Sequence, residues 1–200
     1  MKGVDVSVWN DDVNWELLKE NGIEFAIVRC SYGLSYEDEN FLQNVNGAHE
    51  VGMKVGAYHY STALTPSQAA QEAVMVKKLI ENAGVLLEMP VFFDMEDADG
   101  YKARHSFDFS HKNITEICRA WLDYIKPLNS GIYASYSWLE NYIDWRALGC
   151  PVWNAQWSKY DDLQGYLWQF TDSLVIGGNT FDGNIMYDDK HKAGLNPWEA

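Results

Sequence analysis

The chain has 200 residues, of which 47% are hydrophobic, and this composition suits a single globular domain with a sizeable core. Its formal net charge of −14 argues against a nucleic-acid partner and against an anionic membrane surface, because both recognise patches rich in Lys and Arg. No run approaches the roughly 18 apolar residues that a membrane-spanning helix needs, so we expect no membrane insertion.

The cysteines and the N-terminal segment bear on the compartment. Cys30, Cys118 and Cys150 lie far apart in the sequence, and we expect reduced, buried thiols instead of a disulfide framework. The chain starts without the apolar stretch of a secretory signal peptide. We therefore expect synthesis in the cytoplasm, with any export by another route or through an upstream segment outside this chain.

The first two thirds of the chain alternate strand-like and helix-like segments, which is typical of βα units around a parallel sheet. Helices are predicted after the caps Asn14, Thr65 and Ser110, with a further helix around Val45 and a shorter one from about residue 138 to 142. The predicted strands of this part are 3–9, 25–30, 54–60, 90–96 and 131–135.

The last third shows a different rhythm. Segments 152–157, 166–170 and 181–187 are strand-like, but the gaps between them hold no helical pattern. Eight strands, of which the first five are each followed by a helix, predict an α/β fold: an incomplete TIM-like barrel of the form (βα)5β3, ending in a meander. We expect one catalytic domain over residues 1–188, with 189–200 as a tail or truncated linker.

An acidic segment follows the apolar strand at 90–96. Side chains alternate across a strand, so Asp94 and Glu96 share one face, which in a barrel is the interior near the carboxyl end where active sites lie. Two carboxyl groups crowded on a poorly solvated face cannot both ionise easily, so at least one pKa should rise. A protonated acid beside a carboxylate is the arrangement that cleavage of a glycosidic bond requires.

Two other interpretations of the acidic segment remain. A solvated acidic loop accounts well for Asp97 and Asp99, but poorly for Asp94, which lies inside the apolar run. A Ca²⁺ or Mg²⁺ site is the second, although the EF-hand spacing fails at Ala98. We therefore expect neither a metal nor another cofactor.

Further candidates lie on other predicted strands. Asp5 is on the first and Asp182 on the last, and these strands are neighbours in a closed barrel, so both acids can face the same cleft. No Ser or Cys occupies a nucleophile elbow. His59 is either a packed histidine or a pocket residue, and for each aromatic candidate core packing is the alternative. The candidate substrate-binding residues are Tyr58, His59, Tyr60, Tyr133, Trp153, Gln156 and Trp168.

Six short motifs, in order along the chain, together resemble the family 25 glycoside hydrolases, the cellosyl-type lysozymes that include many phage endolysins. The resemblance implies a barrel of five βα units and three strands. It also implies metal-free hydrolysis of the β-1,4 bond from N-acetylmuramic acid to N-acetylglucosamine. The motifs are Gly3–Ser7, Val55–Tyr60, Phe92–Glu96, Trp153–Gln156, Trp168–Thr171 and Asp182–Asn184.

By this resemblance, Glu96 matches the proton donor and Asp94 the second catalytic carboxylate, acting either as nucleophile or by orienting the substrate N-acetyl group. Asp5 and Asp182 match two further acids of the cleft. The segment 29–33 departs from the family, since many members carry an acidic residue there.

The expected partner is bacterial peptidoglycan, met at the cell wall after release from the cell, with the protein a monomer and a wall-binding domain possible outside this chain. An inactive glycan-binding barrel and a metal-dependent hydrolase are the alternatives.

Overall fold

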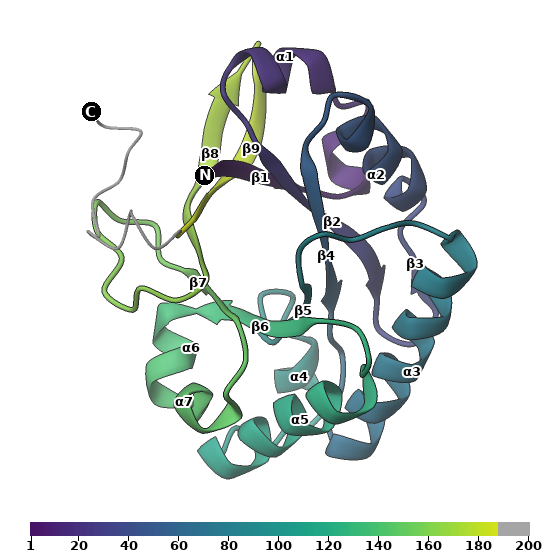
Figure 1. The fold of residues 1–200 in the computed structure, drawn as a ribbon. Helices are drawn as coiled ribbons and strands as arrows, with labels where there is room; N and C mark the ends of the chain where they lie inside the picture. The colour runs from purple at the N-terminus through teal and green to yellow at the C-terminus, as the bar shows by residue number, and fades with distance from the viewer. Residues whose placement is uncertain (188–200) are drawn as a thin grey trace.

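Eight strands form a closed barrel in the computed structural model, which describes residues 1–187 (Figure 1). The sheet closes because β1 pairs with both β2 and β9. A two-residue strand, β3 (Tyr36–Glu37), extends the sheet beyond β2. The predicted α/β barrel is thus confirmed. Its strands are β1 (Lys2–Val6), β2 (Phe25–Tyr32), β4 (Lys54–Tyr60), β5 (Val91–Asp94), β6 (Ser130–Ser135), β7 (Val152–Ala155), β8 (Leu167–Ile176) and β9 (Asn179–Met186).

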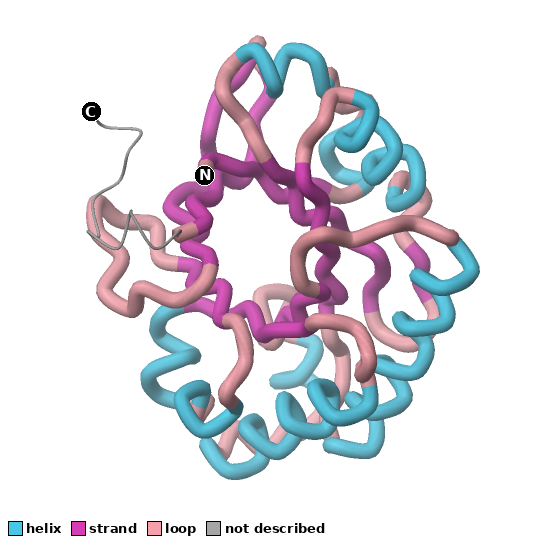
Figure 2. Tube along the Cα trace, in the orientation of Figure 1, coloured by secondary structure: helices cyan, strands magenta, loops and turns pink. Residues whose placement is uncertain are grey.

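Helices cover most of the outside of the ring, and on the side between α6 and α1 loops run instead (Figure 2). The predicted caps form: Asn14, Thr65 and Ser110 each accept a backbone N–H of the first turn that follows. The helices are η1 (Val8–Asn10), α1 (Trp15–Glu20), α2 (Phe41–Glu50), α3 (Pro66–Ala83), α4 (Tyr101–Arg104), α5 (His111–Tyr124), α6 (Tyr136–Asn141) and α7 (Trp145–Leu148).

Strand alternation separates the core inside the barrel from the core between the barrel and its helices, and a third small cluster lies around Trp168. Outward residues such as Val28 and Phe93 pack in a large cluster with the helices, and inward residues such as Phe92, Trp153 and Leu167 form a smaller cluster inside the barrel. The interior is therefore filled with apolar side chains, and polar inward residues are left at the carboxyl ends of the parallel strands.

The expected meander at the end of the chain is wrong for one of its pairings. β7 and β8 are parallel, and they are joined by loop 156–166 without a helix. In that loop Asp161 accepts hydrogen bonds from the Asn154 side chain (2.7 Å) and from the Leu163 N–H (3.0 Å). These contacts hold the crossover against β7 without a helix. Among the eight strands of the closed barrel, the β8–β9 and β9–β1 pairs are the antiparallel ones.

Two expectations bear on the remainder of the chain. The predicted tail or linker at 189–200 lies outside the described residues. Within residues 1–187, no helix is both long and apolar enough to cross a membrane.

Candidate active site

The four predicted acids meet in one cavity at the carboxyl ends of the parallel strands. Its volume is about 140 Å³, and strand alternation points Asp5, Asp94, Glu96 and Asp182 into it from three different strand ends. The cavity is lined by Asp5, Arg29, Tyr58, Tyr60, Asp94, Glu96, Tyr133, Trp153, Gln169 and Asp182.

Asp94 is the last residue of β5, and Glu96 follows it on the same side of the chain. The backbone is held on both sides, since Ser61 N–H donates to the Asp94 carbonyl (3.1 Å) and Met95 N–H donates to the Tyr133 carbonyl (2.9 Å). Asp94 is only 4% exposed, and its Oδ1 has no hydrogen-bond partner among the described residues. Glu96 is half-buried at the cavity mouth.

Burial raises the pKa of both carboxyl groups of this pair. It raises the pKa of Asp94 well above its usual value, and the adjacent charge of Glu96 raises it further. The pKa of Glu96 is also raised by burial, although its hydrogen bond with Asp94 opposes the rise. In the free protein the pKa of the deeper Asp94 carboxyl is therefore the more strongly raised of the two.

Asp5 and Asp182 form a second acid pair on the opposite wall of the cavity. They lie directly opposite each other in the antiparallel register of β1 and β9. Asn184 and Gln169 donate side-chain hydrogen bonds to Asp5 Oδ2 at 2.7 and 3.0 Å. Burial and the charge of Asp182 nevertheless raise the pKa of Asp5 well above its usual value, and burial also raises the pKa of Asp182.

Two amide side chains connect this second pair to the aromatic wall. Gln169 Oε1 accepts from the Tyr133 hydroxyl (3.1 Å) and from Trp157 Nε1–H (3.2 Å). Asn184 Oδ1 accepts from Trp153 Nε1–H (2.8 Å). The orientation of both amides is thereby fixed so that their N–H groups face Asp5. The sequence interpretation missed Gln169 and Asn184 as site residues, although both lie in motifs that carried the family resemblance.

A second hollow of about 650 Å³ joins the cavity, because Glu96 and Tyr133 line both. Its walls are aromatic, and Trp157 is 61% exposed there. Together the two hollows form a cleft, with Glu96 where the deep part meets the open part. The lining of the open part is Glu96, Asp97, Ala98, Tyr133, Ser135, Tyr136, Ser137, Trp138, Ala155, Gln156 and Trp157.

The structure brings most of the predicted substrate-binding residues to this cleft. Tyr58, Tyr60, Tyr133 and Trp153 line the deep cavity, and Gln156 lines the open part. Their contacts with a substrate stay predictions.

His59 and Trp168 do not reach the cleft, and the expectation that they line it is wrong. Both are fully buried, because each alternates outward from its strand. His59 stacks on Trp121 and bonds through Nδ1 to Ser31 Oγ (2.8 Å), while its Nε2 lies 3.3 Å from Glu72 Oε2. Trp168 packs in an outer cluster and donates from Nε1 to the Gln156 carbonyl (2.8 Å).

Asp97 and Asp99 are more than a solvated acidic loop. The Asp97 carboxylate accepts the N–H groups of Lys102 (2.6 Å) and Ala103 (3.1 Å), which anchors the start of α4. Asp99 accepts from the hydroxyls of Tyr32 (2.6 Å) and Tyr60 (3.1 Å), and these bonds lower its pKa against the opposing effect of burial. The loop that carries α4 is thus tied to the ends of β2 and β4.

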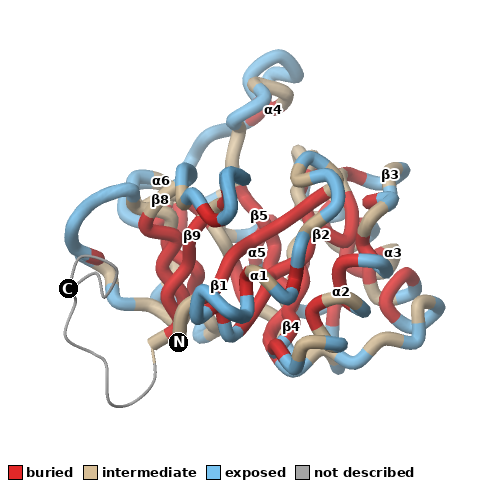
Figure 3. Tube along the Cα trace, turned by 90° about the horizontal axis from the view of Figure 1, so that it is seen from above, coloured by how far each residue is buried: buried red, intermediate tan, exposed pale blue. Residues whose placement is uncertain are grey.

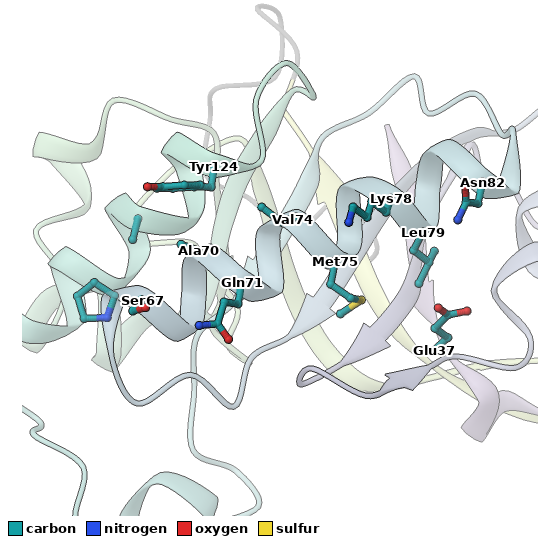
Figure 4. A pocket seen from close by; sticks show the side chains of 12 residues that line it. Glu37, Ser67, Ala70, Gln71, Val74, Met75, Lys78, Leu79, Asn82 and Tyr124 are labelled. Atoms are coloured by element: carbon teal, nitrogen blue, oxygen red, sulfur yellow. The ribbon is translucent and has the colours of Figure 1, made fainter.

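A larger groove lies elsewhere, along the outer face of α3 (Figure 4). It measures about 850 Å³ and runs past Met75 and Val74, with Glu37 and Tyr124 on its sides. Glu37 is its one carboxylate, so it lacks the paired acids that glycosidic cleavage needs. Within residues 1–187, no three His, Cys, Asp or Glu side chains are grouped so as to hold a metal ion.

Comparisons with known proteins agree with this geometry. The model of the family "Glycosyl hydrolases family 25" matches residues 4–179. The autolytic lysozyme of Clostridium acetobutylicum is 26% identical over 183 residues, covering 89% of this chain and 52% of the relative. Lysozyme M1 of Streptomyces globisporus is 35% identical over 71 residues, covering 36% of this chain and 24% of the relative. The chain therefore spans about half the length of the clostridial relative, and the match to the streptomycete relative covers 24% of that protein.

Solved structures share the fold across nearly the whole chain. The modular autolysin LytC from Streptococcus pneumoniae, in complex with a synthetic peptidoglycan ligand, superposes with a TM-score of 0.83 at 22% identity, over 93% of this chain and 46% of that one. The catalytic domain of endolysin ply40 from a Listeria monocytogenes bacteriophage gives a TM-score of 0.76 at 24% identity, over 94% of both chains.

Proposed function

The chain belongs to glycosyl hydrolase family 25, and we propose that it is a peptidoglycan hydrolase that cleaves the β-1,4 bond from N-acetylmuramic acid to N-acetylglucosamine. The observation that carries the proposal is the Asp94–Glu96 pair, two carboxyl groups with raised pKa values that lie where a deep acidic cavity opens into an aromatic cleft. Its place of action would be the bacterial cell wall, and a wall-binding module outside this chain is part of the same proposal.

Glu96 is the proposed general acid. It lies at the junction of the two hollows, so a sugar in the deep cavity and a leaving sugar in the aromatic cleft would place the bridging oxygen beside it. Glu96 would give its proton to this oxygen as the bond to the anomeric carbon breaks. It would then take a proton from the water that completes hydrolysis.

Asp94 is proposed to act through the substrate's own N-acetyl group. Its buried, unpartnered Oδ1 is an acceptor suited to the acetamido N–H, and orienting that amide lets its carbonyl oxygen attack the anomeric carbon. Asp94 and Glu96 come from one strand end and enter the cavity from the same wall, whereas a direct nucleophile attacks from the face opposite the acid.

The same contact would also favour the protonated form of Glu96. A substrate N–H that donates to Asp94 favours its ionised form, and that negative charge raises the pKa of Glu96 when substrate binds. Reaction with a 2-fluoro glycoside distinguishes the two routes. A covalent adduct on Asp94 would show that Asp94 attacks the anomeric carbon directly and would contradict substrate assistance.

The decisive experiment is to digest peptidoglycan, reduce the new ends with borohydride and identify the sugar alcohol. Muramitol is the expected product, and glucosaminitol would mean that the other glycosidic bond is cleaved. Binding to walls without release of reducing ends would indicate a glycan-binding barrel. Loss of activity with EDTA would indicate a metal-dependent hydrolase.

A further inference from the structure

Lys102 is a buried cation beside the acid pair. It lies in α4, which projects beyond the end of the barrel (Figure 3), yet its side chain is buried and the whole residue is 1% exposed. Lysine is rarely buried to this extent, since removing an ammonium group from water is costly unless polar groups surround it. The conformation is imposed from outside the helix, because Asp97 anchors the Lys102 backbone N–H.

The ammonium group joins the carboxyl ends of two neighbouring strands. Lys102 Nζ donates to the carbonyl oxygens of Ser61 (2.5 Å) and Glu96 (2.6 Å). Ser61 directly follows β4 and donates its own N–H to the backbone carbonyl of Asp94. The backbones of Asp94 and Glu96 are therefore both tied to Ser61, that of Glu96 through Lys102. Glu96 lies beyond the last residue of β5, where the strand ladder no longer holds it.

The charge of Lys102 also acts on the pair. Its field favours the carboxylate forms and lowers the pKa of Asp94 and of Glu96, in opposition to burial. Burial in turn lowers the pKa of Lys102 itself, and nearby carboxylates oppose that effect. The charged and titratable groups that face the pair or Lys102 come from the surrounding strands, α3, the α4 loop and α5: Asp5, Arg29, Tyr58, Tyr60, Glu72, Asp97, Asp99, Cys118, Tyr133 and Asp182.

We propose that Lys102 is a positioning residue for the proton donor: it clamps the Glu96 backbone against the end of β4 and sets the charge balance of the Asp94–Glu96 pair. This inference rests on the proposed function for its kinetic consequence. Its electrostatic consequence concerns the free protein and needs no substrate.

Lys102→Met removes the charge while keeping an unbranched chain, and Lys102→Arg keeps the charge. Lys54→Met is the matched control, because Lys54 is exposed at the opposite end of β4. Peptidoglycan hydrolysis is measured against pH. In Lys102→Met we expect the acidic limb of the pH–rate profile to move up by about 1 pH unit, since a nearby cation typically lowers a carboxyl pKa by about 1–3 units. We also expect kcat to fall ~10-fold or more from misplacement of Glu96.

Lys102→Arg should keep the limb where it is in the wild type, and Lys54→Met should change neither quantity. Carboxyl ¹³C NMR titration of the free protein reads the same upward shift without substrate. It therefore separates failure of this inference from failure of the proposed function.

The inference would be overturned if a folded Lys102→Met protein kept the acidic limb of its pH–rate profile and its carboxyl NMR titration curves at the wild-type pH. Lys102→Gln, neutral but still able to donate, serves the same test if the Met variant does not fold. Loss of the fold in both neutral variants would assign Lys102 to stability alone and would equally overturn it.

Discussion

Asp5 and Asp182 face each other directly across the antiparallel β1–β9 pair, the pair that closes the barrel. The closing register therefore places the buried Asp5 carboxyl group beside the half-buried Asp182 carboxyl group, and a shift by one residue would turn one of them out of the cavity. Burial and the charge of Asp182 oppose ionisation of Asp5, and burial opposes ionisation of Asp182, so the fold holds an acid pair that stability alone would disfavour.

This pair should make stability depend on pH. A carboxyl whose folded pKa lies above its unfolded value, about 3.9, stabilises the fold fully below that value and loses this contribution as pH rises through the folded pKa. We therefore expect Asp5→Asn to raise the free energy of unfolding by about 1–3 kcal/mol at pH 7 and to flatten the decline of Tm as the pH rises above about 4. Calorimetry across this range measures both.

The control for Asp5→Asn is Asp123→Asn, since the Asp123 side chain is 58% exposed on α5. Its Tm profile should follow the wild type. A wild-type Tm that rises through the same pH range would contradict the raised pKa of Asp5.

Glu96→Gln should abolish the proton transfer with little effect on the fold. We expect kcat for peptidoglycan hydrolysis to fall ~10³-fold or more, because a general acid typically contributes 10²–10⁴-fold. The reducing ends released from purified walls measure it. Glu116→Gln, an exchange of the same type with a side chain 53% exposed on α5, should leave the rate unchanged. Full activity in Glu96→Gln would end the assignment.

Trp157 should contribute binding in the open part of the cleft. We expect Trp157→Ala to raise KM about 10-fold, since an aromatic contact is worth about 0.5–1.5 kcal/mol beyond its burial. Tyr124→Ala is a matched aromatic control, because Tyr124 is 56% exposed in the larger groove on α3. If Tyr124→Ala raised KM and Trp157→Ala did not, the substrate would lie in that groove instead.

His59 should matter for stability and not for substrate contact. Replacing His59 by Gln leaves Glu72 buried without its histidine partner, so we expect a loss of about 3 kcal/mol in the free energy of unfolding. In denaturant titration, His49→Gln should lose much less, because His49 and Glu88 are partly exposed. A folded His59→Gln protein with a raised KM and unchanged stability would indicate that His59 contacts the substrate in the cleft.

Sequence patterns predicted much of the barrel because local chemistry specifies it. Thr65 and Pro66 define the start of α3, and the apolar run before Asp94 defines β5. Alternation along the predicted strand 90–96 indicates that Asp94 and Glu96 share a face, and the same alternation along β4 explains why His59, between Tyr58 and Tyr60, faces the helices.

The pairing of Asp94 with Glu96 was determined by the sequence itself, since two residues at an interval of two in an extended segment point to the same side whatever surrounds them. The partners of that pair were decided only by the tertiary structure. Gln169 reaches Asp5 across 164 positions of sequence, and Lys102 reaches Ser61 across 41. Such contacts depend on barrel closure and on the path of the α4 loop, and no local periodicity encodes either.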